Sequence, residues 1–154
     1  GLRLIGGGEA ENILKMKELI SELEISDRVE YLGYVPTEEI PSLLMRSKIL
    51  VLARPSSKQA EGGFPTKLGE YLATKRPVVV TRVGEIPKYL SPESAFLVDP
   101  DSIDSITEAI FKILQDYEEA CKIGAQGRKV VEKVFNSAVQ SKRIESFLYN
   151  LRGV

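Results

Sequence analysis

Residues 52–81 of the chain read LARPSSKQAEGGFPTKLGEYLATKRPVVVT. In this segment a glycine pair leads into a helical pattern over Pro65–Thr74, with Glu70 about one turn inside the helix. The first backbone N–H groups of a helix have no partner within it and carry partial positive charge, so the pattern predicts an anion-binding helix start. Pro65 suits the first helical position, because its missing N–H would go unused there. The alternative is a plain surface loop that leads into an amphipathic helix.

Short apolar runs alternate with helical patterns on both sides of this segment. The runs that predict strands are Leu2–Ile5, Arg28–Leu32, Lys48–Ala53, Val78–Val80 and Ala95–Val98. The third and fourth runs lack a polar face, which is typical of parallel strands buried on both sides. Strands that alternate with helices indicate an α/β fold with a parallel sheet of about five strands flanked by helices. Only helical patterns follow Val98, so we expect a helical C-terminal segment.

The composition excludes several classes of function. With 154 residues, of which 43% are apolar, the chain is long enough for one domain with a hydrophobic core. Its net charge of −1, with the two signs interspersed, leaves no basic patch for nucleic acid. The absence of histidine and the single cysteine, Cys121, argue against zinc sites and histidine acid–base catalysis. No run reaches the ~20 apolar residues of a membrane span. We therefore expect a cytoplasmic protein.

The segment EGGFPTKLGEYLATKRPVVVT resembles the signature of the retaining, two-domain (GT-B) glycosyltransferases of the large glycosyltransferase-four family, the glycosyl transferases of group one. In that family a loop reading E-G-F-P-x-x-L-x-E-x-x-A is followed by P-V-V. Other blocks of the family's C-terminal domain resemble, in the same order, LRLIGGGE, VEYLGYVPTEEIPSLLMRSKILVLARPS, VGEIPKYL and AFLVDPDSIDSITEAI. The resemblance implies that residues 1–154 form a Rossmann-like domain that binds a nucleoside-diphosphate sugar.

The resemblance also implies a role for several residues of the central motif. Backbone N–H groups of Thr66, Lys67 and Leu68 would bind the diphosphate, with the Thr66 hydroxyl as a further donor. The Lys67 ammonium would neutralise phosphate charge, although an exposed lysine at a helix start is as often simply solvated. Glu70 would accept hydrogen bonds from both ribose hydroxyls. The remaining residues of the predicted donor site are Gly63, Phe64, Pro65, Tyr34 and Val35.

The Tyr34–Val35 turn follows a predicted strand at its C-terminal end, where ligands bind in α/β sheets. In the family that the chain resembles, the equivalent loop touches the nucleotide base through backbone groups. An equally open interpretation is that Tyr34 is a half-buried aromatic residue that packs on Pro36.

Glu61 departs from the family spacing. The family places its two glutamates one residue closer together than Glu61 and Glu70, and the position that matches its first glutamate is Gly62. We expect the extra glycine to be absorbed as a small bulge, so that Glu61 still reaches the donor sugar and acts in catalysis together with Lys67. The alternative is that Glu61 is a solvated loop residue.

Parts of the family pattern have no counterpart in this sequence. They are the family's first strand, the Arg and Lys that follow it and clamp the diphosphate, and the N-terminal domain with the acceptor site. We expect the first strand's place to lie between the strands at Leu2–Ile5 and Lys48–Ala53. The C-terminal helix within 136–154 would pack on the absent N-terminal domain, or else on this domain's own sheet.

We therefore expect the donor-binding half of a retaining glycosyltransferase of the hexosyltransferase type, inactive as this fragment alone and without a metal or other cofactor. Peripheral association with the inner face of the membrane stays open for the full-length protein. One alternative is a non-catalytic Rossmann-like domain that binds a nucleotide or a partner. Another is a dinucleotide-dependent oxidoreductase, suggested by Gly6–Gly8, but Glu11 stands where that fingerprint needs its third spaced glycine. The base, the sugar and the acceptor are not indicated.

Overall fold

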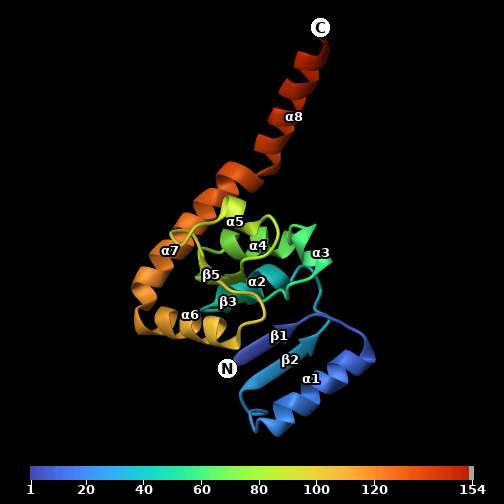
Figure 1. The fold of residues 1–154 in the computed structure, drawn as a ribbon, viewed down its shortest axis with the longest axis vertical. Coiled ribbons are helices and arrows are strands. Elements are labelled where there is room, and N and C mark those ends of the chain that lie inside the picture. The colour runs from blue at the N-terminus through green and yellow to red at the C-terminus, as the bar shows by residue number, and fades with distance from the viewer. Residues whose placement is uncertain (153–154) are drawn as a thin grey trace. The chain divides into compact units, whose positions relative to one another are not determined.

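The structure, a computed structural model, describes residues 1–152. By its internal contacts the chain divides into an N-terminal unit, Gly1–Leu43, and a C-terminal unit, Leu44–Val154. Figure 1 shows the order of helices and strands along the chain. Each unit is described by itself.

The N-terminal unit contains strand β1 (Leu2–Ile5), helix α1 (Ala10–Glu22) and strand β2 (Val29–Gly33). β1 and β2 pair in parallel, with Leu2 opposite Val29, and the register shifts before Ile5 pairs with Gly33. No side chain of residues 1–43 is fully buried. Two strands and one helix offer too little apolar area to enclose a core of their own.

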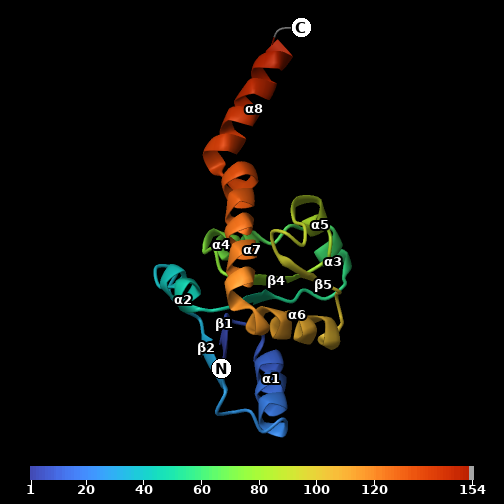
Figure 2. The ribbon, with the colours of Figure 1, turned by 90° about the vertical axis from the view of Figure 1, so that its left-hand side faces the viewer.

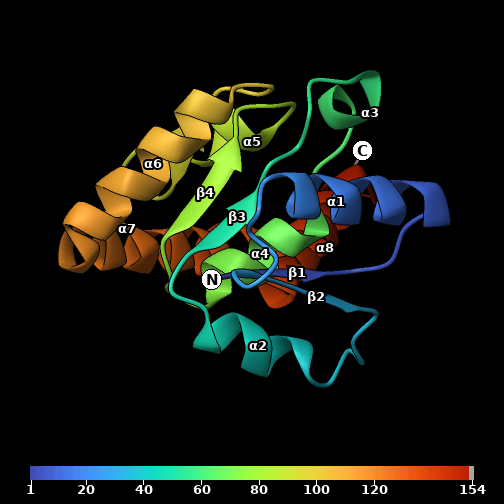
Figure 3. The same ribbon diagram turned by 90° about the horizontal axis from the view of Figure 1, so that it is seen from below.

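The C-terminal unit contains a parallel sheet in the order β3 (Leu50–Leu52), β4 (Val78–Thr81), β5 (Phe96–Val98). All four residues of β4 are buried, as expected for the central strand of a sheet covered on both faces. On one face Val79 packs in a core cluster with Ile113 of α6 (Ile103–Gln115), and Figure 3 shows α6 beside β4.

The other helices of this unit follow the order of the chain. They are α3 (Lys58–Glu61), α4 (Thr66–Ala73), α5 (Ile86–Tyr89), α7 (Tyr117–Val130), the π-helical turn η1 (Val131–Phe135) and α8 (Ser137–Arg152), while α2 (Ile40–Arg46) spans the boundary between the units. α4 contacts α7, and the two lie side by side in Figure 2. The inner face of α4 is formed by Leu68 and Leu72, both fully buried.

α8 leaves the C-terminal unit after η1 (Figure 2). Asn136 caps its start, because the Asn136 Oδ1 accepts a hydrogen bond of 2.9 Å from the Ala138 N–H. The apolar side chains of α8 are more than half exposed to solvent, and they are Ile144, Phe147, Leu148 and Leu151. Of the predicted segment 136–154, residues 153 and 154 lie outside the described residues. Within residues 1–152, no helix is long and apolar enough to cross a membrane.

The predicted α/β class, the parallel strands and the helical C-terminal segment are confirmed. The five strands of the described chain belong to two separate sheets, β1–β2 and β3–β4–β5, so no backbone pairing joins the strand at Leu2–Ile5 to the one at Leu50–Leu52. This division agrees with the expectation that a further strand belongs between them. The predicted strand Lys48–Ala53 is reduced to its three central residues.

Candidate functional site

The central motif begins where two buried strands end. The Arg54 N–H, just after β3, donates to the Oγ1 of Thr81, the last residue of β4, at 3.0 Å. Thr81 is almost fully buried, so this hydrogen bond fixes the start of the loop. Both residues follow the carboxyl ends of adjacent parallel strands, which is the edge where ligands bind in α/β sheets.

The polar segment before the glycine pair contains a helix that the sequence did not predict. α3 is capped by Ser57, whose Oγ accepts from the Ala60 N–H at 3.1 Å. Gly62 is the C-cap of α3, with φ −88° and its N–H bonded to the Lys58 carbonyl. The extra glycine therefore ends a helix and does not form the bulge that we expected. Glu61 is the last residue of α3, with an exposed carboxylate that has no hydrogen bond or ion pair to residues 1–152.

The loop after β4 presses on the end of α3. Gly84 has a φ of +56°, a conformation that favours glycine. A Cβ at this position would lie 2.5 Å from the Ala60 carbonyl oxygen and 3.0 Å from that of Glu61. Only a residue without a side chain permits this approach, so Gly84 fixes the backbone of Glu61. Sequence reasoning missed this contact, because the two residues belong to different blocks of the motif pattern.

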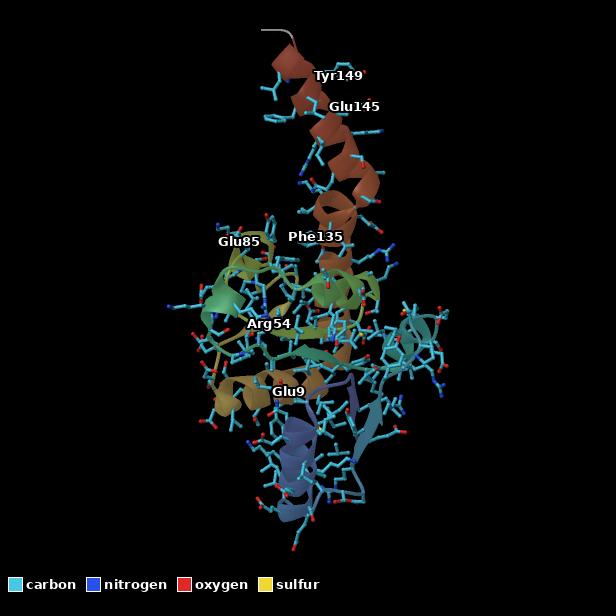
Figure 4. All side chains as sticks on the ribbon, turned by 90° about the vertical axis from the view of Figure 1, so that its right-hand side faces the viewer. Glu9, Arg54, Glu85, Phe135, Glu145 and Tyr149 are labelled. Atoms are coloured by element: carbon cyan, nitrogen blue, oxygen red, sulfur yellow. The ribbon has the colours of Figure 1, made fainter. Side chains whose placement is uncertain are left out.

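The donor loop, defined as residues 62–65, connects α3 to α4. Its Gly63 carbonyl accepts from Nη1 of Arg54 at 3.2 Å. Arg54, labelled in Figure 4, is half-buried and has no carboxylate partner in the described chain. Pro65 is the N-cap of α4 with extended backbone angles, one position before the one predicted, and no side chain caps the helix.

The first turn of α4 offers free backbone donors. The Leu68 N–H, which we expected to be available, donates to the Pro65 carbonyl at 3.0 Å, and the Leu68 side chain is fully buried. For the N–H groups of Thr66 and Lys67, no acceptor is found among residues 1–152. These two groups remain open to an anion at the positive end of the helix.

The outer face of α4 carries the polar residues of the motif. Thr66 and Glu70 lie four residues apart, so they share one side of the helix, and both are exposed like Lys67. The Glu70 carboxylate has no ion pair in the described structure, which leaves its oxygens free to accept hydrogen bonds. Burial, and then the neighbouring Glu70 charge, raise the pKa of Tyr71.

Phe64 does not present its ring freely to a ligand. Its ring lies 5.6 Å from that of Tyr89 and 4.9 Å from that of Phe135, and these two rings are 5.4 Å apart. Phe64 therefore contributes to the donor loop by packing. Sequence reasoning did not find Tyr89 or Phe135, because nothing local marks them as neighbours of Phe64.

Tyr34 and Val35 follow β2 in the N-terminal unit, apart in sequence from the rest of the predicted site. The side chain of Tyr34 is 82% exposed, so the interpretation of a half-buried aromatic on Pro36 is wrong. Gly33 has a φ of +63° and turns the chain at this point. Contact of this turn with a base stays a prediction.

Comparison with known proteins extends these observations. A family model described as glycosyl transferases group 1 matches residues 2–130. The chain is 31% identical over 122 residues to an MMP alpha-(1->4)-mannosyltransferase of Mycolicibacterium hassiacum, covering 78% of this chain and 28% of that protein. It is 29% identical over 154 residues to the putative colanic acid biosynthesis glycosyltransferase WcaL of Escherichia coli, covering 97% of this chain and 37% of that protein. The chain thus spans less than two fifths of either relative.

Solved structures share the fold. A sucrose-phosphate synthase of Thermosynechococcus elongatus aligns with a TM-score of 0.84 at 23% identity, over 99% of this chain and 38% of that one. HepE of Anabaena in complex with UDP aligns with a TM-score of 0.84 at 19% identity, over 96% of this chain and 40% of that one. At these identities the likeness shows the fold alone.

Proposed function

The chain belongs to the group 1 glycosyl transferases, and on this premise we propose that its C-terminal unit binds the nucleoside-diphosphate sugar of a retaining hexosyltransferase. The observation that carries the proposal is the open first turn of α4, with two N–H groups that lack a protein acceptor and a free carboxylate one turn further on. A diphosphate and a ribose diol need these two kinds of partner.

In this proposal each polar group of the motif has one task. The N–H groups of Thr66 and Lys67 hold the diphosphate, and the Thr66 hydroxyl adds a donor. The Lys67 ammonium, exposed at the helix start, offsets charge that develops on the leaving diphosphate. Glu70 accepts hydrogen bonds from the ribose hydroxyls. No metal takes part in the proposed site.

The proposed transfer retains the configuration of the sugar. The bond from the anomeric carbon to the diphosphate oxygen breaks while the acceptor oxygen attacks from the same face, and the departing phosphate takes the acceptor proton. The exposed carboxylate of Glu61 contacts the sugar hydroxyls in this arrangement, and the contact from Gly84 fixes its backbone. The nucleotide itself does not touch Glu61.

The remaining parts of the enzyme lie outside residues 1–154 in this proposal. The acceptor site and the cationic clamp belong to other segments, so these residues alone transfer no sugar. The exposed apolar face of α8 packs on an N-terminal domain. The enzyme works in the cytoplasm, free or at the inner face of the membrane. Family membership favours a transferase over a dinucleotide-dependent oxidoreductase, and measured transfer separates it from a non-catalytic binding domain.

The test is calorimetric titration of the protein, expressed with any segments that flank residues 1–154, with UDP, GDP and ADP. We expect one of them to bind, and we expect Glu70→Gln to weaken that binding by about 1–3 kcal/mol through lost charged hydrogen bonds. Glu108→Gln removes an exposed carboxylate from α6 and serves as the matched control. Absence of binding by all three nucleotides, or equal affinity of the two variants, would refute the proposal.

A further inference from the structure

Three aromatic rings from distant parts of the sequence meet beside the donor loop. The aromatic cluster consists of Phe64, Tyr89 and Phe135, with ring centroids 4.9–5.6 Å apart. Two of its three pairs meet edge to face, a favourable geometry for aromatic rings. Phe64 belongs to the donor loop, Tyr89 ends α5 and Phe135 ends η1. The cluster therefore connects the donor loop to two helical elements that carry no predicted site residue.

The π-helical turn determines where the ring of Phe135 points. η1 spans Val131–Phe135 and continues α7 without a break. A π turn contains one residue more than an α turn, and each residue of a helix advances by about 100°, so the following side chains are rotated relative to a continuous α-helix. The turn thus places Phe135 on the side of the helix that faces Phe64.

Both supports of the aromatic cluster are anchored in the C-terminal unit. Nη1 of Arg128 in α7 donates to the Ala73 carbonyl at the end of α4 at 2.7 Å. Gly127 lies so close to the loop before β5 that a Cβ there would be 2.6 Å from the Ser94 carbonyl oxygen. On the other side Ile86, the first residue of α5, is fully buried. Phe64 is consequently held between two elements that cannot shift independently of the sheet.

The donor loop itself contains little that would fix it. Gly62 is exposed, Gly63 has no side chain, and Pro65 makes no cap hydrogen bond. Phe64 is the residue through which this loop packs, and it lies directly before the N-cap of α4. A loop that must be ordered when a ligand binds costs affinity, and a loop that is already ordered does not.

From this geometry we infer that Tyr89 and Phe135 are positioning residues for the donor, which act through Phe64 to hold the first turn of α4 in its nucleotide-binding conformation. The inference rests on the proposed function, because it concerns the same site. It adds two residues outside the motif, and it assigns to η1 the role of a support for the donor loop.

The test compares variants in their affinity for UDP or GDP, whichever the unaltered protein binds. We expect Phe135→Leu and Tyr89→Leu to weaken binding about three- to tenfold, in line with the worth of one or two aromatic pairs. Tyr89→Phe should restore the affinity, because the Tyr89 hydroxyl makes no hydrogen bond within the described chain. Hydrogen exchange of the peptide 62–69 should be faster in the two leucine variants without nucleotide.

Two controls separate positioning from a general loss of stability. Phe111→Leu removes a ring that is 62% exposed on α6, and it should change neither affinity nor exchange. Ile113→Val lowers stability from within the core and should leave the affinity intact.

Unchanged affinity in Phe135→Leu and Tyr89→Leu would overturn the inference while leaving the proposed function in place. Equal losses in Tyr89→Phe and Tyr89→Leu, or an equal loss in Ile113→Val, would also overturn it. Failure of the unaltered protein to bind UDP, GDP or ADP would overturn the proposed function and this inference together.

Discussion

Replacing Gly124 with alanine should destabilise the C-terminal unit. Gly124 lies in α7 and is buried against the turn between α4 and β4. A Cβ at this position would lie 2.5 Å from the Lys75 carbonyl oxygen and 2.7 Å from that of Arg76. Both contacts are with backbone atoms, which cannot rotate away as a side chain can. α7 must therefore move outward to accept the methyl group.

The expected magnitude follows from two opposing effects. Glycine in a helix interior is about 0.8–1.0 kcal/mol less favourable than alanine, so the substitution gains that amount in an open position. Overpacking of a close-packed site costs about 1–3 kcal/mol, and a contact as short as 2.5 Å to backbone lies at the upper end of that range. We expect the free energy of unfolding to fall by about 1–2 kcal/mol.

Gly69→Ala is the matched control. Gly69 is also helical, in α4, and a Cβ there would meet no atom within 4 Å, so this variant should gain about 0.5–1 kcal/mol. The assay is urea unfolding followed by far-ultraviolet circular dichroism, because the chain has no tryptophan. If Gly124→Ala stabilises the protein as much as Gly69→Ala does, α7 does not pack on the α4–β4 turn as described, and the reasoning fails.

Three further predictions concern the site and its surroundings. Glu61→Gln should strongly depress sugar transfer in the full-length enzyme while leaving nucleoside-diphosphate affinity nearly unaltered, and unaltered transfer would show Glu61 to be a solvated residue. Arg54→Met removes the hydrogen bond to the Gly63 carbonyl and should lower the free energy of unfolding by about 1 kcal/mol, measured in urea; an unchanged midpoint would contradict this. Burial and the Glu70 charge raise the pKa of Tyr71 above 10.0, so the fold keeps the hydroxyl neutral where the unfolded chain ionises it. Stability should fall as the pH rises past about 10, and a melting temperature that falls as steeply in Tyr71→Phe would refute this assignment.

The strands could be predicted from the sequence because each is a short apolar run with polar ends. Val78–Val80 has no polar face, and the structure buries every residue of β4. The ends of the strands were less certain, since apolar character continues beyond the last ladder hydrogen bond, as at Ala53. α3 was missed because its four residues, KQAE, are mostly polar and too few to show a period. Its one local signal is Ser57, a common N-cap residue.

The supports of the site could not be predicted, because they join positions far apart in the chain. Phe64, Tyr89 and Phe135 are separated by 25 and 46 residues, and no periodicity relates them. The same holds for Gly84, whose need for glycine comes from the carbonyl groups of α3. Helical patterns in the sequence predict which face of a helix is buried, and the partner of that face is set by the topology.

The donor loop was recognisable for a reason that the helix caps make clear. The Oγ of Ser102 accepts from the third N–H of α6, and the Oδ1 of Asp116 does the same for α7, so their first turns are partly satisfied by the protein. Pro65 holds the same position before α4, and it has no side-chain acceptor. It therefore leaves the N–H groups of Thr66 and Lys67 without a partner, which costs stability unless water or a ligand supplies the acceptor. A helix start that lacks its own cap, at the carboxyl edge of a buried parallel sheet, is thus ready for an anion through its backbone alone, and the side chains of the motif are left to recognise the rest of the ligand.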